Sequence, residues 1–367
     1  MKLFSSPIQS LAVSSLIFSL LIAPTLPAMA DELETPLTQE EKQFQQDVQE
    51  CIAILEGTGI VENNDNLVER YCETKIMAKK RGKLGRFAKR TLAEKATELN
   101  PFVITPHASS YIMPIAITDN FNQEAYSLID SPIGEEGGEE VYFADKMQNI
   151  EAKYQVSFKV PLRSHSLITQ GDSLYFAMTI QAWWQVYSAD ISKPFRETNY
   201  KPEIMYLSPL PWSFAGGNFG YLVTLEHQSN GQVQGLSRSW NRLHVGLIYD
   251  TDQYSIAFKP WYRITENKKK SQFDPKGDDN PDIEDYLGHS DFMFAYAFND
   301  EHKLSGNIRK NFKTGNGSIE LGYTFPFPFS SRLRGYAQYF SGYGESLIDY
   351  NHKQQKFGLG IALTDVF

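Results

Sequence analysis

The chain has 367 residues and a formal net charge of −9, so it is long enough for one large domain or two ordinary ones. The acidic balance argues against a nucleic-acid partner, because nucleic-acid phosphates require basic surface. After residue 30 no apolar run approaches the ~18–20 residues that a membrane-spanning helix needs. If the protein enters a membrane, it must do so as a closed β-barrel.

The first thirty residues have the pattern of a secretory signal. Lys2 precedes an apolar stretch, and the small residues "AMA" come directly before Asp31. We expect cleavage there, which removes one positive charge and leaves a mature formal charge of −9 − 1 = −10. An uncleaved membrane anchor is the less favoured alternative.

Residues 31–100 have a helical pattern. A first helix is predicted to open at a Thr38–Glu41 capping box and to end at Gly57. A second helix starts at Asn64 or Asp65. These two predicted helices precede a run of basic residues.

The only two cysteines, Cys51 and Cys72, fall in these two predicted helices. A chain that is exported enters an oxidising compartment, where two cysteines can form a disulfide. We therefore predict a disulfide that joins the helices into a hairpin. The basic run could meet anionic lipid head groups, although a solvated helix face is favoured. It consists of Lys75, Lys79, Lys80, Arg81, Lys83, Arg86, Lys89 and Arg90.

From about residue 105 the sequence alternates apolar and polar residues over segments of roughly ten residues, separated by turn residues. All five tryptophans lie at or beyond residue 183. This pattern predicts a transmembrane β-barrel, and a soluble β-sandwich would alternate similarly. Twelve candidate strands begin near 109, 149, 173, 197, 217, 237, 253, 285, 302, 317, 331 and 356.

The end of the chain supports a barrel. In "KFGLGIALTDVF", Phe357, Leu359, Ile361 and Leu363 share one face of a strand, and Phe367 keeps that parity. A final strand that closes on a terminal aromatic residue resembles the assembly signal of outer-membrane barrels.

A possible catalytic group lies in residues 225–242, "LEHQSNGQVQGLSRSWNR". His227 and Ser229 have the parity of the apolar set Tyr221, Val223 and Leu225, which marks the lipid face. On the next strand Asn241 has the parity of Leu243, Val245 and Leu247, whereas Trp240, Arg242 and His244 point to the interior. The polar turn 230–236 folds the two strands into a hairpin, which is expected to bring Asn241 beside His227.

These three residue types suit nucleophilic catalysis. Ser229 would attack, His227 would take its proton, and Asn241 would hold the imidazole in one tautomer. A neutral amide in the third place avoids the desolvation of a carboxylate at an apolar surface. The alternative is a chance polar pair at the membrane rim, but two adjacent strands each place a suitable residue on the lipid-facing side. A nucleophile that faces lipid would act on lipid.

The hairpin resembles the active-site hairpin of the outer membrane phospholipase A family, through "HQSNG" and "SRSWNRL". Supporting stretches are "WWQ" at 183–185, "PFRETNY" at 194–200, "KPWY" at 259–262, "DDNPDI" at 278–283 and "SGYGESLIDYN" at 341–351. The resemblance covers roughly 105–367. It implies a twelve-stranded antiparallel barrel with a packed interior, and calcium-dependent hydrolysis of phospholipid acyl esters at both glycerol positions by a homodimer.

The resemblance also implies site residues. It makes His227, Ser229 and Asn241 the catalytic triad and the amide of Gly231 an oxyanion donor. Calcium would be held by the carbonyl of Gln232, by Ser237 and by Ser192 of the partner subunit, and hard oxygen ligands with several waters suit calcium.

Two positions bear on the calcium sites. Gln232 stands where the family has arginine, which is harmless if only the carbonyl binds. Gln234 stands where the family can carry an acidic residue, so a second, weaker calcium site is expected to be altered. Asp279 is a candidate ligand of that site, and a solvated acidic loop is an equal alternative.

The sequence therefore predicts an outer-membrane phospholipase with three parts: a signal peptide over 1–30, a periplasmic helical segment over 31–104 and the barrel over 105–367. Monomers would be dormant because part of the calcium site and of the acyl groove is missing. The rival hypothesis is a non-enzymatic barrel, a narrow channel or a structural protein, in which the hairpin is a relic.

Overall fold

The structure is a computed structural model. It describes residues 39–57, 68–69, 72–73, 75–76, 85–86, 89–90, 94, 104–126, 134–136, 139–163, 167–169, 171–233, 235–271, 274, 276–330 and 333–364. The predicted signal peptide, the start of the second predicted helix, Gln234 and Phe367 lie outside these ranges. Among the described helices, none is long and apolar enough to cross a membrane.

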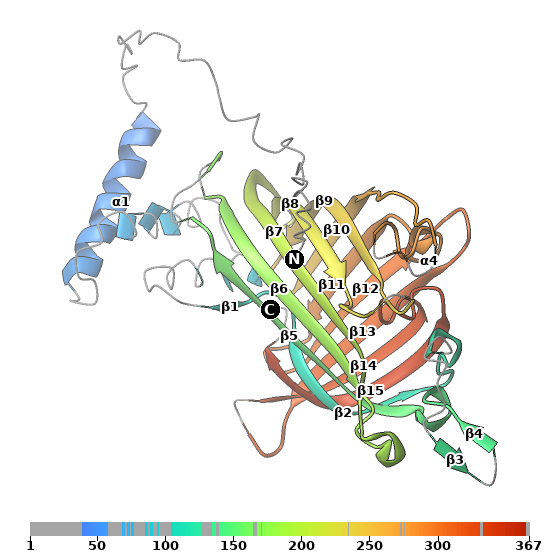
Figure 1. The fold of residues 1–367 in the computed structure, drawn as a ribbon. Helices are drawn as coiled ribbons and strands as arrows, with labels where there is room; N and C mark the ends of the chain where they lie inside the picture. Colours follow the sequence, from blue (N-terminus) through green and yellow to red (C-terminus); the bar gives the residue numbers. More distant parts are fainter. Residues whose placement is uncertain are drawn as a thin grey trace, which may run out of the picture. The chain divides into compact units, whose positions relative to one another are not determined.

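Apart from β3 and β4, the described strands after residue 104 form one antiparallel sheet, and the pairing of β5 with β6 closes it into a barrel (Figure 1). The twelve barrel strands are β2 (Ser110–Thr118), β5 (Ile150–Pro161), β6 (Ser173–Trp184), β7 (Phe195–Phe214), β8 (Gly217–Ser229), β9 (Ser239–Asp250), β10 (Tyr254–Ile264), β11 (Ser290–Ala297), β12 (Lys303–Lys310), β13 (Gly317–Pro326), β14 (Arg334–Tyr343) and β15 (Lys353–Thr364). The short strand β1 (Thr105–Pro106) pairs with β5 beside β2, and β3 (Gly134–Glu136) pairs with β4 (Glu139–Val141) in a separate hairpin. Three short 3-10 helices, η1 (Glu124–Tyr126), η2 (Ala144–Lys146) and η3 (Ala189–Ile191), lie in the connections.

The predicted barrel is thus confirmed, and all but one of the twelve predicted strands begin within three residues of the observed start. The exception is β11, expected near 285 and observed from Ser290. The helix α4 (Ile283–Leu287) occupies the expected start. Ile283 and Leu287, four residues apart, are buried on one face of that helix. Their spacing thus belongs to a helix and not to a strand.

The described part of the N-terminal segment contains the helix α1 (Gln39–Gly57), as predicted. The predicted disulfide between Cys51 and Cys72 is present. It lies in a small apolar cluster with Val48 and Ile76. The two cysteines therefore anchor this segment around a core of its own.

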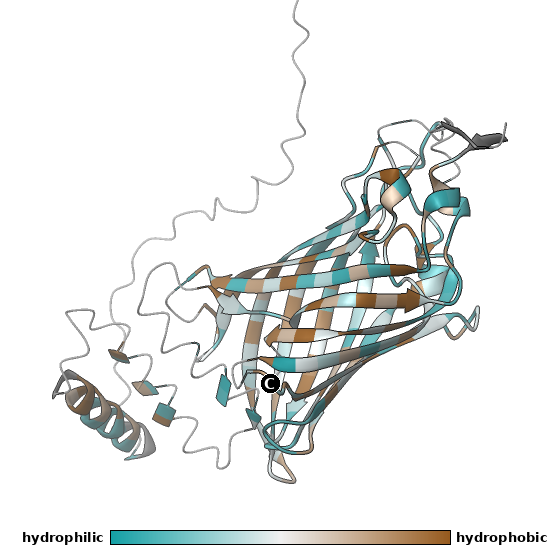
Figure 2. Ribbon diagram, turned by 90° about the horizontal axis from the view of Figure 1, so that it is seen from below, coloured by the Kyte–Doolittle hydropathy of each residue, from teal (hydrophilic) through white to brown (hydrophobic). Residues whose placement is uncertain are grey.

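Hydrophobic and hydrophilic residues alternate along many strands of the barrel wall (Figure 2), as expected when successive side chains of a strand point to opposite faces. On β8 and β9 the apolar side chains that point outward are exposed, with 50% of Leu225 and 54% of Val245 accessible. The side chains with the opposite parity, among them Thr224, Glu226 and Arg242, are buried. An apolar exterior with a polar interior is the arrangement of a transmembrane barrel.

The interior of the barrel is filled by charged side chains that pair with one another. Lys153 Nζ lies 2.8 Å from Glu345 Oε1, and Lys356 Nζ lies 3.0 Å from Glu345 Oε2 and 2.7 Å from Glu151 Oε1. Arg196 Nε lies 2.7 Å from Glu151 Oε2. All five side chains are buried. At this level the interior is packed rather than open to water.

The connections between strands differ at the two ends of the barrel. The end that carries the β8–β9 connection, residues 230–238, is called the hairpin rim below. Long connections gather there, including 119–149 and 265–289, whereas the opposite rim has short ones such as 215–216 and 251–253.

Three described members of the basic run, Arg86, Lys89 and Arg90, contact the barrel at the opposite rim. Arg86 lies 2.8 Å from Asp300 and donates to the carbonyl of Asp252 at 2.6 Å, and Lys89 pairs with the Asp252 carboxylate. Arg90 donates to the carbonyl of Pro106 at 2.6 Å. The sequence favoured a solvated helix face for this run, but these three side chains bind the barrel's own acidic and carbonyl oxygens. That pairing could not be read from the run itself.

Candidate active site

The register of β8 and β9 places the proposed base opposite its proposed orienter. His227 pairs with Asn241 across the two strands, and Nδ1 of His227 lies 2.8 Å from Oδ1 of Asn241. An amide oxygen can only accept, so Nδ1 carries the proton and Nε2 is left with its lone pair. The prediction that Asn241 lies beside His227 is confirmed.

Ser229 lies on the same face of β8 as His227, two residues further along, where the strand ends at the hairpin rim. It stands opposite Ser239 of β9 and opposite Tyr200 of β7. Among the described residues no hydrogen bond joins Ser229 to His227. Nucleophile–base contacts that are long before substrate binds commonly tighten only in the complex.

The interior side of the hairpin is rigidly packed. Arg242 pairs with Glu226, and its guanidinium lies 3.7 Å from the ring centre of Trp240 and 5.0 Å from that of Trp261. His244 Nε2 lies 3.5 Å from Glu226 Oε2. The predicted inward orientation of Trp240, Arg242 and His244 is confirmed, because all three are buried. The outward residues His227 and Asn241 therefore project from a fixed wall.

Asn230 organises the turn that follows the serine, and it was not singled out from the sequence. Its Oδ1 accepts the amides of Gln232 at 3.3 Å and Arg238 at 2.9 Å. Its Nδ2 donates to the carbonyl of Leu236 at 2.9 Å and to Glu197 of β7 at 3.2 Å. The Asn-Gly pair was the available signal, since Asn side chains commonly bond nearby backbone groups in turns.

Gly231 has a φ of +63°, a conformation that a residue with a Cβ rarely adopts. Within the described part of the chain its amide has no acceptor. This N–H, two residues after Ser229, is thus available for a ligand, as an oxyanion donor requires.

The candidate calcium ligands lie at the same rim. Ser237 Oγ donates to Asp279 Oδ2 at 2.8 Å, and Asp279 also pairs with Lys269. The neighbouring Asn280 accepts the amide of Ser239 at 3.0 Å, which ties the loop of Asp279 to the hairpin. The Ser237 hydroxyl and the Asp279 carboxylate thus lie together, and both offer the oxygen ligands that calcium prefers. The ammonium of Lys269 already pairs with the same carboxylate.

Gln232 follows Gly231 in the turn, and Ser192 lies in the β6–β7 connection at the same rim. Ser192 and Lys193 both have positive φ, at 59° and 52°. The structure brings Ser237 and Asp279 into contact. Between Ser192 and the described residues of the hairpin there is no hydrogen bond. In the described residues no group of three or more His, Cys, Asp or Glu side chains is arranged to hold a metal.

Aromatic and charged side chains tie the neighbouring loops to the hairpin. The guanidinium of Arg238 lies 5.9 Å from the ring centre of Tyr350. Tyr350 donates from its hydroxyl to Asp282 Oδ1 at 2.7 Å. Burial, and the bond to Asp282, raise the pKa of the Tyr350 hydroxyl, so it stays a donor.

A second residue that sequence reasoning missed is Glu266, just beyond the end of β10. Asn241 Nδ2 donates to its Oε1 at 3.0 Å. The strand register explains the contact, because Ile264 lies directly opposite Asn241 and Glu266 follows it by two. No local sequence pattern joins residues 241 and 266.

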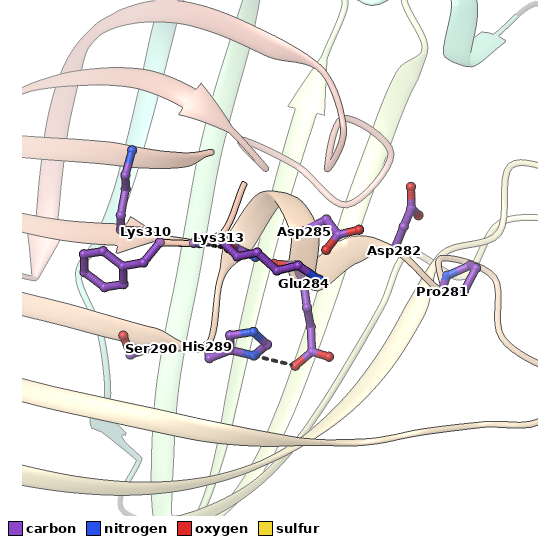
Figure 3. A pocket seen from close by; sticks show the side chains of 10 residues that line it. Pro281, Asp282, Glu284, Asp285, His289, Ser290, Lys310 and Lys313 are labelled. Atoms are coloured by element: carbon purple, nitrogen blue, oxygen red, sulfur yellow. Dashed lines mark hydrogen bonds and ion pairs between the residues drawn. The ribbon is translucent and has the colours of Figure 1, made fainter. Parts of the chain in front are cut away.

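A pocket of about 530 Å³ lies on the hairpin-rim side of β11 and β12, around α4 (Figure 3). Glu284 and His289, which are 3.1 Å apart, line it together with Asp285 and Lys310. None of the triad residues lines this pocket, so it is separate from the hairpin site.

Comparisons with known proteins agree with this geometry. The family model for phospholipase A1 matches residues 87–363. Phospholipase A1 from Klebsiella pneumoniae and that from Escherichia coli strain K12 are each 34% identical over 269 residues, which are 73% of this chain and 85% and 84% of those proteins.

Solved structures of the same family match the fold. Outer membrane phospholipase A from Escherichia coli matches with a TM-score of 0.63 and 33% identity, over 73% of this chain and 94% of that one. The Salmonella typhi outer membrane phospholipase, a dimer with bound calcium, matches with a TM-score of 0.62, at the same identity and coverage. This chain therefore belongs to the phospholipase A1 family of outer-membrane β-barrel enzymes.

Proposed function

We propose that His227, Ser229 and Asn241 carry the hydrolysis of phospholipid acyl esters by this outer-membrane enzyme. The observation that carries the proposal is the His227–Asn241 contact of 2.8 Å, formed on the lipid-facing side of the wall. Phospholipids and lysophospholipids are the substrates, with cleavage at either glycerol position. A site on the outer wall meets lipid directly, so the substrate need not leave the membrane.

In this mechanism Asn241 fixes the imidazole so that Nε2 faces the serine. Nε2 takes the proton of the Ser229 hydroxyl as Oγ attacks the ester carbonyl, and the amide of Gly231 donates to the developing oxyanion. His227 then gives the proton to the leaving alcohol, and water hydrolyses the acyl-serine by the same steps. Each role needs only groups that the hairpin presents on one face.

Calcium would be held by the Gln232 carbonyl and the Ser237 hydroxyl of one subunit and by Ser192 of its partner, with Asp279 as a ligand of a second site. When bound, the cation would supply a polarised water to the oxyanion. Support comes from the Ser237–Asp279 contact and from the calcium bound in the Salmonella typhi dimer. The Lys269 ammonium is expected to compete with a cation at Asp279.

Activity would require a homodimer, because one hairpin offers far fewer than the 6–8 oxygens that calcium usually takes. A membrane disturbance that brings phospholipid to the outer leaflet and lets monomers meet would switch the enzyme on. The hairpin rim would face outward, since long connections mark the extracellular end of such barrels. We propose no nucleic-acid partner.

We propose the three-part division predicted above, with a signal peptide over 1–30, a periplasmic segment over 31–104 and the barrel over 105–367. Arg86 contacts a turn at the rim opposite the hairpin rim, and Arg90 contacts β1 there; both contacts fit a periplasmic position for this segment.

One assay separates the enzyme from a non-enzymatic barrel. Purified protein in detergent is given phospholipid and calcium, and released fatty acid is measured. The proposal expects hydrolysis by the native chain, none by Ser229→Ala and little in excess chelator. Hydrolysis that persists in Ser229→Ala would contradict the triad, and a native chain without activity would favour a channel or a structural protein.

A further inference from the structure

Glu266 is bound to the residue that orients the proposed base, and no part of the mechanism above uses it. Asn241 Nδ2 lies 3.0 Å from Glu266 Oε1, while Asn241 Oδ1 lies 2.8 Å from His227 Nδ1. The three side chains come from β8, from β9 and from the residues just beyond β10. They form one row along the outer face of the wall, next to Ser229.

The direction of each hydrogen bond in this row follows from chemistry. An ionised carboxylate can only accept, so the amide nitrogen of Asn241 must face Glu266. The amide oxygen then faces His227, which must donate from Nδ1. Without Glu266 the Asn241 amide could rotate by half a turn and offer an N–H to the imidazole. The ring would then favour the other tautomer, with its proton on Nε2, where it cannot act as the base.

We propose that Glu266 is a positioning residue for hydrolysis, acting through Asn241 to hold His227 in the tautomer that leaves Nε2 unprotonated. The proposal rests on the triad proposed above. The carboxylate also adds a negative charge to a row whose orienting group is neutral, and so stabilises the imidazolium that forms when Ser229 loses its proton. Asn241 and Glu266 together thereby perform the two functions that a single aspartate has in the usual triad: they orient the imidazole and stabilise its protonated form.

The register supports a built arrangement. Ile264 is the partner of Asn241 in the β9–β10 pairing, so the chain that carries Glu266 leaves the sheet directly beside the hairpin. Glu266 itself is exposed. Water therefore screens its charge, and the effect of removing it should be moderate.

The first test is Glu266→Ala in the full-length protein, assayed in detergent with calcium. A hydrogen bond to a charged group is worth ~1.5–3 kcal/mol, and an exposed one should lie at the low end of that range. A loss of ~1.5 kcal/mol of transition-state stabilisation lowers the rate constant about tenfold. We expect kcat to fall about tenfold with KM unchanged, because Glu266 does not touch substrate. Glu284→Gln is the matched control: this carboxylate also binds a histidine at the hairpin rim, His289, and its loss should leave kcat unaltered.

The second test exchanges the two functional groups. Asn241→Asp alone places two carboxylates face to face and should lower kcat strongly. Adding Glu266→Gln restores the row, because the glutamine amide donates to the new aspartate, which still accepts from Nδ1 of His227. We expect the double variant to be at least about tenfold more active than Asn241→Asp, a rescue that a merely structural role would not produce.

Folding is checked by the mobility of unheated and heated protein on denaturing gels. The proposal is overturned if Glu266→Ala retains kcat within about twofold of the native chain, or if the exchange gives no rescue. Loss of activity in Ser229→Ala, measured alongside, separates this proposal from the triad itself: a fully active Ser229→Ala defeats the triad, whereas an unaffected Glu266→Ala defeats only the positioning role.

Discussion

His227 and Asn241 face each other across β8 and β9, with Nδ1 of the imidazole 2.8 Å from Oδ1 of the amide. Because the contact lies on the outward face of the barrel, the proposed base is oriented at the lipid surface rather than in a cleft. The relationship between the two residues is set by strand register, which also places Ser229 at the end of β8.

The first prediction concerns the triad. Ser229→Ala or His227→Ala should lower kcat by at least about 10⁴-fold, because the nucleophile and its base act as one unit. Asn241→Ala should lose less, since the serine and histidine remain. Fatty-acid release measures all three, and equal losses in the three variants would contradict the subordinate role of Asn241.

The second prediction concerns the proposed calcium site shared between two subunits. Ser192→Ala and Ser229→Ala, each inactive alone, should regain activity when mixed, because the chain that keeps Ser229 receives an intact Ser192 from its partner. Each mixed dimer has one working site. Mixing Ser229→Ala with His227→Ala is the control that should stay inactive, since neither chain then has a complete triad. Failure of the first mixture would rule against the shared site.

The third prediction concerns Lys269, which pairs with Asp279. Lys269→Ala should tighten calcium binding at least several-fold, because the ammonium competes with the cation for the same carboxylate. Both side chains of this ion pair are largely buried, so water screens the pair less than the exposed pairs that are worth ~0.2–1 kcal/mol. Titration calorimetry with calcium measures this directly. Lys270→Ala, the adjacent exposed lysine, is the control. A calcium affinity that is the same in both variants would show that Lys269 does not compete.

The fourth prediction concerns the disulfide between Cys51 and Cys72. Protein from the exporting cell should contain no free thiol by mass spectrometry. Closing a loop of this order is worth ~3 kcal/mol to the segment in the chain-entropy model. Replacing both cysteines by alanine should therefore loosen the N-terminal segment to proteolysis and leave barrel folding intact. Two free thiols in the native protein would refute the bridge.

The fifth prediction concerns the packed interior. Glu345→Ala leaves the buried ammonium groups of Lys153 and Lys356 each without one partner. Breaking a buried pair in this way costs ~3–5 kcal/mol. The temperature at which the barrel unfolds on gels should fall clearly, whereas Glu284→Gln at the exposed rim should leave it unaltered. An unshifted unfolding temperature would mean that water reaches the interior.

The amino-acid sequence by itself determined the barrel, the starts of nearly all its strands and the face on which His227, Ser229 and Asn241 lie. The physical reason is that a strand repeats every two residues, so parity along the chain specifies the face without knowledge of the rest of the fold. The polar connection 230–238 joins β8 and β9 into a hairpin, and their register brings Asn241 to His227.

Only the tertiary structure decided the contacts that bind one segment to another. Asn241 meets Glu266 25 positions away, and Ser237 meets Asp279 42 positions away, through a loop whose path no local pattern specifies. The same holds for Arg86, whose partners Asp252 and Asp300 lie in connections between strands more than a hundred residues further along the chain. Such contacts depend on which strands are neighbours and how far each runs before its loop begins, and these follow from closure of the whole barrel.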